Sequence, residues 1–252
     1  MLTTSVLGAA TARPPLLIAH GLFGSARNWG VMARRLSDSR MVFVVDMRNH
    51  GSSAWLPSHS YVDLAADLAE VAAPHGSLDV LGHSMGGKAA MALALIRPEL
   101  VHRLLVADIA PVAYAHSQTP LIHAMRGLDL SQVANRGEAD LMLAAAIPDD
   151  ATRAFLLQSL DLKSDPPRWR FNLAVFEAEM AAIAGWPSIS GSFSGPALFL
   201  SGSLSTYVRT EHRGAIRALF PDARFAKIPG AGHWLHADKP REFEASVRAF
   251  LD

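Results

Sequence analysis

The feature that most limits the possible folds is a regular alternation of short apolar runs with segments of helical periodicity. The runs are rich in Val, Leu, Ile and Phe, which is typical of strands buried on both faces; they span residues 15–19, 41–46, 78–82, 101–108, 196–201 and 223–228. Apolar residues at helical spacing occur in residues 60–71, in residues 85–96 and after Asp238. This alternation predicts an α/β fold with a mostly parallel sheet and helices on both faces.

The alternation stops after Asp108. Residues 111–190 have mostly helical patterns and no clear strand. A stretch of about 80 residues is far longer than an ordinary connection, so we expect an inserted helical lid. The core would then comprise residues 1–110 and 191–252. Ligands bind beyond the carboxyl ends of strands in open parallel sheets, and the insertion begins at such an end.

Composition limits the compartment and the partners. The 252 residues include 23 Lys and Arg and 23 Asp and Glu, so no net charge favours nucleic acid or an anionic membrane. The absence of cysteine excludes disulfides and thiolate nucleophiles, and we expect a cytoplasmic protein. No apolar run approaches the roughly 20 residues of a membrane span. The N-terminus MLTTSVLGAATARPP lacks the basic and apolar regions of a signal peptide.

The glycine-rich segment GHSMGGKA, residues 82–89, fits two motifs. It matches G-x-S-x-G around Ser84, the nucleophile elbow of serine hydrolases, and also the first seven positions of a P-loop ending at Lys88. Residues 104–108 even resemble the strand that ends in a magnesium-binding aspartate. However, a P-loop needs Ser or Thr after its lysine, and Ala89 follows here. The elbow is therefore favoured, and we expect Lys88 at the solvent side of the next helix.

Three further segments contain the partners that a serine nucleophile requires. HGLFG follows the first apolar run, where such hydrolases take one backbone N–H of the oxyanion hole; the second comes from the residue after the nucleophile. These donors would be Phe23, or alternatively Leu22, and Met85. His233 in GAGHW lies near the C-terminus, where the general base belongs in the order Ser, acid, His. Asp108 lies between the two in sequence, as that order requires.

Together, HGLFGS, DMRNHGSS, GHSMGGKA, ADIAPVAY and GAGHWLHADKP resemble the α/β-hydrolase superfamily, and within it the YbfF-like bacterial esterases, over nearly the whole chain. The resemblance implies an α/β-hydrolase fold with an inserted helical lid. It also implies Asp108 as the acid, because YbfF-like enzymes take the acid from the D-I-A-P segment. Asp222 is the other candidate, although Phe-Pro-Asp reads as a surface turn.

Two departures from the wider superfamily stand out. Many α/β-hydrolases carry the acid in a pattern like G-x-x-D after the strand predicted at 196–201, whereas this chain has Gly202-Ser-Leu-Ser205. The N-terminal segment is also short, which leaves little room for the usual leading strands.

We therefore expect a serine hydrolase that cleaves carboxylic esters, or acyl thioesters, without a cofactor or a metal ion. Ser84 would attack the carbonyl, His233 would accept its proton, and Asp108 would orient the imidazole. A cofactor-free perhydrolase or C–C bond hydrolase would use the same triad, and a non-catalytic ligand-binding protein of this fold is the alternative of a different class. Residues expected to contact the small-molecule substrate are Phe23, Trp169, Phe171, Phe176 and Trp234.

Overall fold

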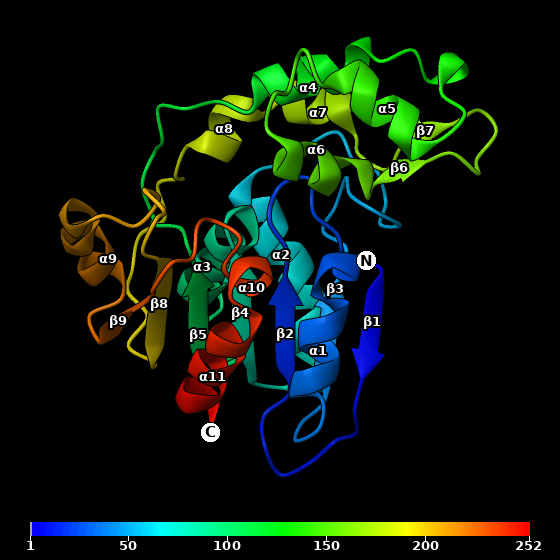
Figure 1. Ribbon diagram of the computed structural model, residues 1–252. Coiled ribbons are helices and arrows are strands. Elements are labelled where there is room, and N and C mark those ends of the chain that lie inside the picture. The colour runs from blue at the N-terminus through cyan, green and yellow to red at the C-terminus, as the bar shows by residue number, and fades with distance from the viewer. Residues whose placement is uncertain (1) are drawn as a thin grey trace.

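A seven-stranded sheet runs through the computed structural model, which describes residues 2–252 (Figure 1). The strand order is β1-β3-β2-β4-β5-β8-β9. The strands are β1 (Thr4–Leu7), β2 (Leu16–Ala19), β3 (Val42–Val45), β4 (Leu78–His83), β5 (Val101–Ala107), β8 (Ala197–Gly202) and β9 (Ala223–Ile228). Neighbouring strands are parallel apart from β1, which is antiparallel to β3. The predicted mostly parallel sheet is confirmed.

The edge strand β1 is a feature that the sequence pattern did not reveal. It pairs Thr4 with Val45 and Leu7 with Val42. Its residues are exposed or half-buried, so it lacks the continuous apolar run by which the buried strands were found. The N-terminal segment was expected to leave little room for the usual leading strands, and it contains one strand of four residues at the sheet edge.

Successive residues of the central strands point to opposite faces of the sheet. Leu16 and Ile18 of β2 pack in the same cluster as α1 (Gly30–Leu36) and α11 (Pro240–Leu251). Leu17 of β2 packs in the cluster formed with the helices of the other face, α2 (Tyr61–Ala72) and α3 (Met85–Ile96). Helices therefore cover both faces, as predicted.

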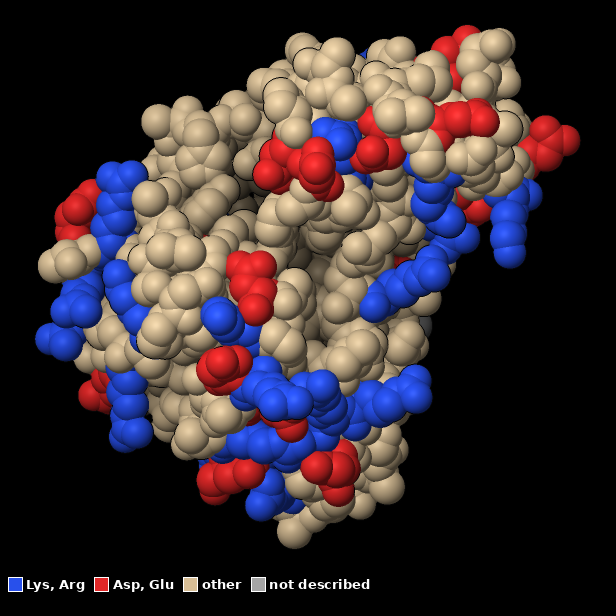
Figure 2. Space-filling model, in the orientation of Figure 1, with Lys and Arg blue, Asp and Glu red and all other residues tan. Residues whose placement is uncertain are grey.

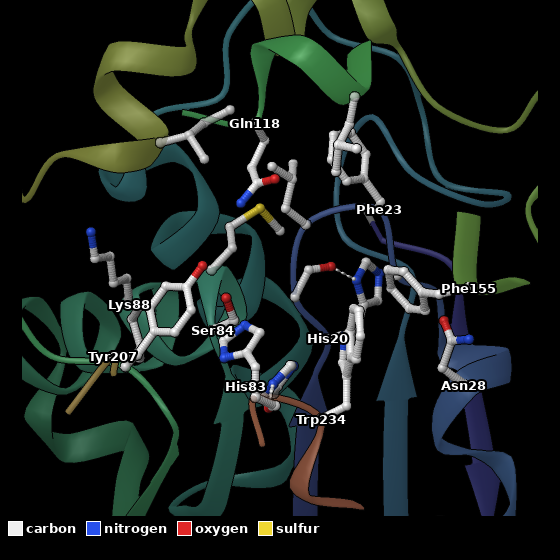
Figure 3. A pocket seen from close by; sticks show the side chains of 18 of the residues that line it. His20, Phe23, Asn28, His83, Ser84, Lys88, Gln118, Phe155, Tyr207 and Trp234 are labelled. Atoms are coloured by element: carbon white, nitrogen blue, oxygen red, sulfur yellow. Dashed lines mark hydrogen bonds between the residues drawn. The ribbon is translucent and has the colours of Figure 1, made fainter. Parts of the chain in front are cut away.

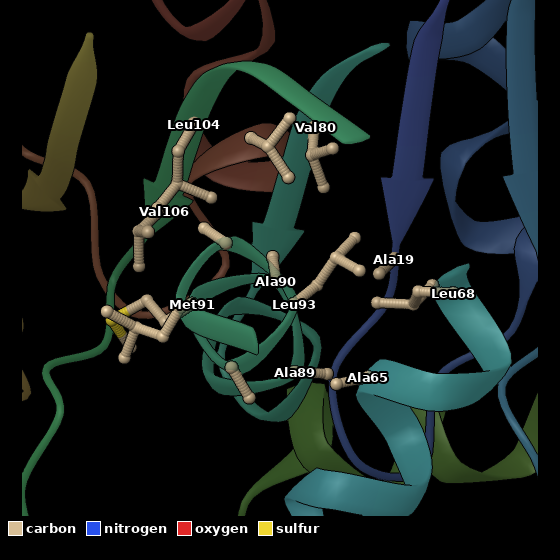
Figure 4. Packing of buried hydrophobic residues seen from close by; sticks show 14 of the residues in the cluster. Ala19, Ala65, Leu68, Val80, Ala89, Ala90, Met91, Leu93, Leu104 and Val106 are labelled. Atoms are coloured by element: carbon tan, nitrogen blue, oxygen red, sulfur yellow. The ribbon is translucent and has the colours of Figure 1, made fainter. Parts of the chain in front are cut away.

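The central position of α3 explains its composition. Eleven of its twelve residues are buried, and its small side chains let the backbones approach closely. Figure 4 shows Ala89 beside Ala65 of α2, and Leu93 on the side that faces Ala19 and Val80 of the sheet. A helix buried all round cannot show the amphipathic pattern of a surface helix, which is why its sequence reads as a nearly continuous apolar run.

The chain between β5 and β8 forms five helices that lie together over the carboxyl ends of the strands (Figure 1). They are α4 (Thr119–Gly127), α5 (Arg136–Leu143), α6 (Asp150–Leu157), α7 (Leu173–Ala178) and α8 (Met180–Ala184). We call residues 111–190 the helical segment. Its buried apolar residues form one cluster, which also includes Phe23 of the core. The expectation of no strand here was wrong, because β6 (Leu160–Asp161) pairs with β7 (Arg168–Trp169); strands of two residues are too short to produce a periodic pattern.

The remaining elements are short. They are α9 (Arg213–Leu219), α10 (Leu235–Asp238) and the 3₁₀ helices η1 (Ala26–Trp29), η2 (Ala73–His75), η3 (Pro98–Leu100), η4 (Leu130–Gln132) and η5 (Thr210–His212). Within residues 2–252, no helix is both long enough and apolar enough to cross a bilayer.

Candidate active site

A pocket lies between the carboxyl ends of the central strands and the helical segment. It has a cavity volume of about 300 Å³, and Figure 2 shows this face of the molecule hollowed beneath the helical segment, with mostly uncharged side chains around the hollow. The sheet side contributes Ser84 and His233 to its wall, and the helical segment contributes Leu121, Phe155 and Met180. The candidate nucleophile and the candidate base therefore both lie in the wall of this pocket.

Ser84 occupies the sharp turn between β4 and α3. Its backbone has φ 53° and ψ −121°, a strained conformation for a residue with a side chain and one that clusters at functional sites. A Cβ atom at Gly82 would lie 2.2 Å from the carbonyl oxygen of Gly86, and one at Gly86 would lie 2.4 Å from the carbonyl oxygens of Ala19 and His20. Both glycines of G-x-S-x-G are thus required by close backbone approach, which lifts the serine into the pocket (Figure 3).

Asp108 follows β5 and is completely buried. Its Oδ2 accepts a hydrogen bond from Nδ1 of His233 at 2.7 Å. The backbone N–H of Gly202 donates to Oδ1 at 3.2 Å, and the Ser205 hydroxyl donates to Oδ2. Each oxygen of the Asp108 carboxylate therefore accepts a hydrogen bond. Because His233 uses Nδ1 for this contact, its Nε2 remains available to accept a proton.

Ser205, which supports Asp108 from the loop after β8, was missed by the sequence analysis. It stands in the segment Gly202-Ser-Leu-Ser205, where many α/β-hydrolases carry the acid itself. Here the segment donates hydrogen bonds to a carboxylate that comes from the neighbouring strand. A polar residue at a strand end where an acid was expected is the signal that could have identified it.

The His233 ring and its backbone are both fixed. The ring of Tyr207 stacks on it, with centroids 4.1 Å apart and planes at 22°. The carbonyl of His233 lies 2.8 Å from Nε2 of His83, which donates to it. Among residues 2–252, no hydrogen bond joins the Ser84 hydroxyl to His233; the two groups line the same pocket. Catalytic contacts of this kind commonly tighten only when substrate binds.

The structure distinguishes the two candidate oxyanion-hole residues of the HGLFG loop. Phe23 has φ 60°, and its backbone N–H donates to Nε2 of His50 at 3.2 Å. The N–H groups of Leu22 and Met85 have no hydrogen-bond partner among residues 2–252, and both residues line the pocket. Leu22 and Met85 are therefore the pair that is free to bind an oxyanion.

Several buried histidines surround this loop, and burial lowers the pKa of each one. The pKa of His59 falls to about 3 and that of His236 to about 4, in both cases chiefly by desolvation. Desolvation also lowers the pKa values of His20, His50 and His83. Burial thus favours the neutral imidazoles, and His20, His50, His59 and His83 serve as hydrogen-bond partners, whereas His236 stacks on Trp29. Among residues 2–252, no group of three or more His, Asp or Glu side chains is arranged to hold a metal ion.

Lys88 does not lie on the solvent side of α3, and that expectation was wrong. It is only 1% exposed, and its Nζ donates to the carbonyl oxygens of Ala184 at 3.0 Å and Gly185 at 2.5 Å. Desolvation lowers the pKa of the ammonium group to about 7. The reason is geometric: Lys88 lies four residues after Ser84, on the helix face that the helical segment covers.

Only two of the five expected substrate contacts line the pocket, namely Phe23 and Trp234. Trp169, Phe171 and Phe176 instead pack in the core of the helical segment, where Nε1 of Trp169 donates to a backbone carbonyl at 3.0 Å. Their placement as substrate contacts was wrong: Trp169 lies in β7, and the rings of Phe171 and Phe176 pack against Phe23 beneath the helical segment. The helical segment reaches the pocket through other residues, including Leu121, Phe155, Leu156 and Met180.

Comparisons with known proteins identify the family of this chain. Residues 14–240 match a family model described as alpha/beta hydrolase fold. The chain is 37% identical over 260 residues to the sn-1-specific diacylglycerol lipase ABHD11 of Mus musculus, covering 99% of this chain and 85% of that protein. It is 36% identical over 241 residues to the esterase YbfF of Escherichia coli (strain K12), covering 94% and 93%.

A solved structure is also similar to this chain over its whole length. The marine microorganism esterase superposes with a TM-score of 0.94 at 37% identity, and the match covers 99% of both chains. The resemblance to YbfF-like esterases is thereby confirmed, and this chain belongs to the α/β-hydrolase family.

Proposed function

We propose that this chain is a serine hydrolase that cleaves carboxylic esters through an acyl-enzyme on Ser84. The observation that carries the proposal is the hydrogen bond of 2.7 Å from His233 to the buried carboxylate of Asp108, with Ser84 in the wall of the same pocket. The relatives named esterase and lipase support ester hydrolysis as the reaction class.

In this mechanism His233 Nε2 accepts the hydroxyl proton as Ser84 Oγ attacks the carbonyl carbon. Asp108 keeps the other proton on Nδ1 and stabilises the imidazolium that forms. The carbonyl oxygen, which becomes negative in the tetrahedral intermediate, accepts hydrogen bonds from Leu22 and Met85; each such donor is worth about 3 kcal/mol at the transition state. The alcohol leaves with the proton from His233, and water then attacks the acyl group with the same assistance.

The helical segment would act as a lid that shapes the acyl site. Its side chains Leu121, Phe155 and Met180 line the pocket opposite Ser84, and about 300 Å³ is at the small end of ligand pockets. We therefore propose short to medium acyl groups as the substrates. Acyl thioesters fit the same chemistry, and a screen of acyl-CoA compounds beside p-nitrophenyl esters would separate the two classes.

Covalent labelling tests the proposal directly. A fluorophosphonate probe should label the native chain at Ser84, and Ser84→Ala should abolish both labelling and the hydrolysis of p-nitrophenyl butyrate, by about 10⁶-fold in kcat. A native chain that binds esters but is neither labelled nor active would instead be a ligand-binding protein of this fold. Perhydrolase activity would appear as peracid formation from an ester and hydrogen peroxide in place of hydrolysis.

A further inference from the structure

The pocket contains one charged side chain whose role the triad does not explain. Among the described residues that line the pocket, none is Asp or Glu, and Lys88 is the single Lys or Arg. The carboxylate of Asp108 is completely buried and bound to His233, Gly202 and Ser205. The cavity open to substrate therefore has a cation in its wall and no anion.

Within residues 2–252, Lys88 has no carboxylate partner of the kind that a buried cation normally requires. Its ammonium group contacts two backbone carbonyls at the end of α8, and the rings of Tyr61 and Tyr114 at 5.4 Å and 4.8 Å from their centroids. Carbonyl dipoles and ring faces compensate only part of the lost hydration of a full charge. The two carbonyls take two of the three N–H donors of the ammonium, which leaves one for a ligand.

The position of Lys88 relative to Ser84 suits an acyl chain with a polar end. Ser84 directly precedes α3 and Lys88 lies one helical turn further along; the Lys88 side chain extends away from Ser84 (Figure 3), and both residues line the pocket, so an acyl chain of several methylene groups would be needed to join them. Figure 3 shows Lys88 and Tyr207 on one side of Ser84, and Phe155 and Asn28 on the opposite side. The side of the pocket near Lys88 is polar. A hydrogen bond of 2.7 Å joins Nε2 of His116 to the Tyr207 hydroxyl, and Gln118 points into the pocket.

We propose that Lys88 is a specificity-determining residue that selects esters whose acyl chain carries a carboxylate, that is, half-esters of dicarboxylic acids. The carboxylate would accept a hydrogen bond from the third N–H of the ammonium group and form an ion pair with Lys88. The carboxylate would be positioned by Lys88 while Ser84 attacks the ester carbonyl at the other end of the chain. This inference rests on the proposed serine hydrolase function.

The test compares matched substrates on one enzyme preparation. Monoethyl succinate, glutarate and adipate are paired with ethyl butanoate, pentanoate and hexanoate, in which a methyl group replaces the carboxylate. The quantity measured is the ratio of kcat/KM for each charged ester to that of its neutral partner. The ratio cancels differences in the amount of folded enzyme between variants, so a partly unfolded variant remains interpretable.

We expect the native enzyme to favour at least one half-ester, and Lys88→Met to lower that ratio by about 10- to 100-fold, the effect of removing a charge-assisted hydrogen bond. Lys88→Arg should restore part of the preference, because it keeps the charge. The exposed Lys163 provides the matched control: Lys163→Met removes the same charge outside the pocket and should leave the ratio unchanged.

Three results would overturn the inference: a native ratio at or below one for every pair, a ratio that survives Lys88→Met, or an equal loss in Lys163→Met. Failure of the proposed function looks different, because the neutral esters would then not be hydrolysed and Ser84 would not be labelled. A preference that persists at 0.5 M salt supports a desolvated pair in the pocket, since exposed charges are largely screened there; a preference lost in salt contradicts it.

Discussion

Replacing Asp108 with Asn tests the catalytic assignment with little change in shape. Asp108 has φ 53°, a left-handed conformation that Asn tolerates well and that Ala would strain. The new amide oxygen can still accept the N–H of Gly202. However, the amide NH₂ would then face Nδ1 of His233, where the carboxylate oxygen now accepts a hydrogen bond of 2.7 Å. An NH₂ group there requires Nδ1 to be an acceptor, so the ring proton moves to Nε2.

A His233 that carries its proton on Nε2 cannot accept the proton of Ser84, and the wrong tautomer in a comparable triad costs about 10⁴-fold in kcat. We expect Asp108→Asn to lose on that order with p-nitrophenyl butyrate, measured as kcat and KM separately, with KM little changed. The control is Asp222→Asn, because Asp222 is exposed in the turn before β9. A loss below 10-fold in Asp108→Asn, or a large loss in Asp222→Asn, would refute the reasoning.

Three other substitutions test the supports of the site and the core. Ser205→Ala removes one donor to Asp108, and kcat should fall about 10-fold because a hydrogen bond to a charged group is lost; unchanged kcat would leave Ser205 without a role. His236 has a pKa of about 4, and its Nδ1 has no hydrogen-bond partner in the described part of the chain. Its folded pKa lies below the unfolded value near 6.5, so the unfolded chain takes up the proton first and stability is lost as pH falls below 6.5. His236→Phe should therefore gain about 2 kcal/mol at pH 5 relative to its effect at pH 7, measured by urea unfolding; an equal effect at both pH values would contradict this. Asp79→Ala removes the buried carboxylate 2.6 Å from Arg40 and leaves the partly exposed Asp252 at 2.8 Å as its remaining carboxylate partner, and should destabilise the fold by about 3 kcal/mol; a change of Tm within 1 °C would count against it.

The elements that could be predicted from the sequence are those in which one physical requirement dominates. Buried parallel strands need continuous apolar runs, and six of the seven strands of the sheet were found in this way. The nucleophile turn needs glycine at positions 82 and 86 because backbone atoms lie within 2.4 Å of any added Cβ. The elbow is separated from a P-loop by a different position, because Ala89 follows Lys88 where a P-loop needs Ser or Thr.

The features that could not be predicted depend on which face another part of the chain covers. Lys88 was expected at the surface, but the helical segment covers it, and this contact cannot be read from the sequence around Lys88. Trp169, Phe171 and Phe176 were expected to line the pocket, but the sequence does not show which side of the helical segment an aromatic ring faces, and all three are buried inside it. The choice between Leu22 and Phe23 depended on His50, which is far along the sequence and whose ring nitrogen binds the Phe23 N–H.

The attachment of the helical segment has a consequence for how molecules reach Ser84. On one side, backbone hydrogen bonds join Gly51 to Arg170 and Asn172 to Asn49. At the other end, the Tyr61 hydroxyl and Lys88 bind three successive carbonyls at the end of α8. In contrast, α6 meets the sheet side through side chains, such as the rings of Phe155 and Trp234, whose centroids are 5.3 Å apart.

Side-chain contacts separate more easily than anchored backbone does. We therefore expect the route between bulk water and the nucleophile to pass beneath α6. To admit bulkier molecules, Phe155 and its neighbours should be replaced by smaller residues, while the hydrogen bonds at both ends of the helical segment are kept.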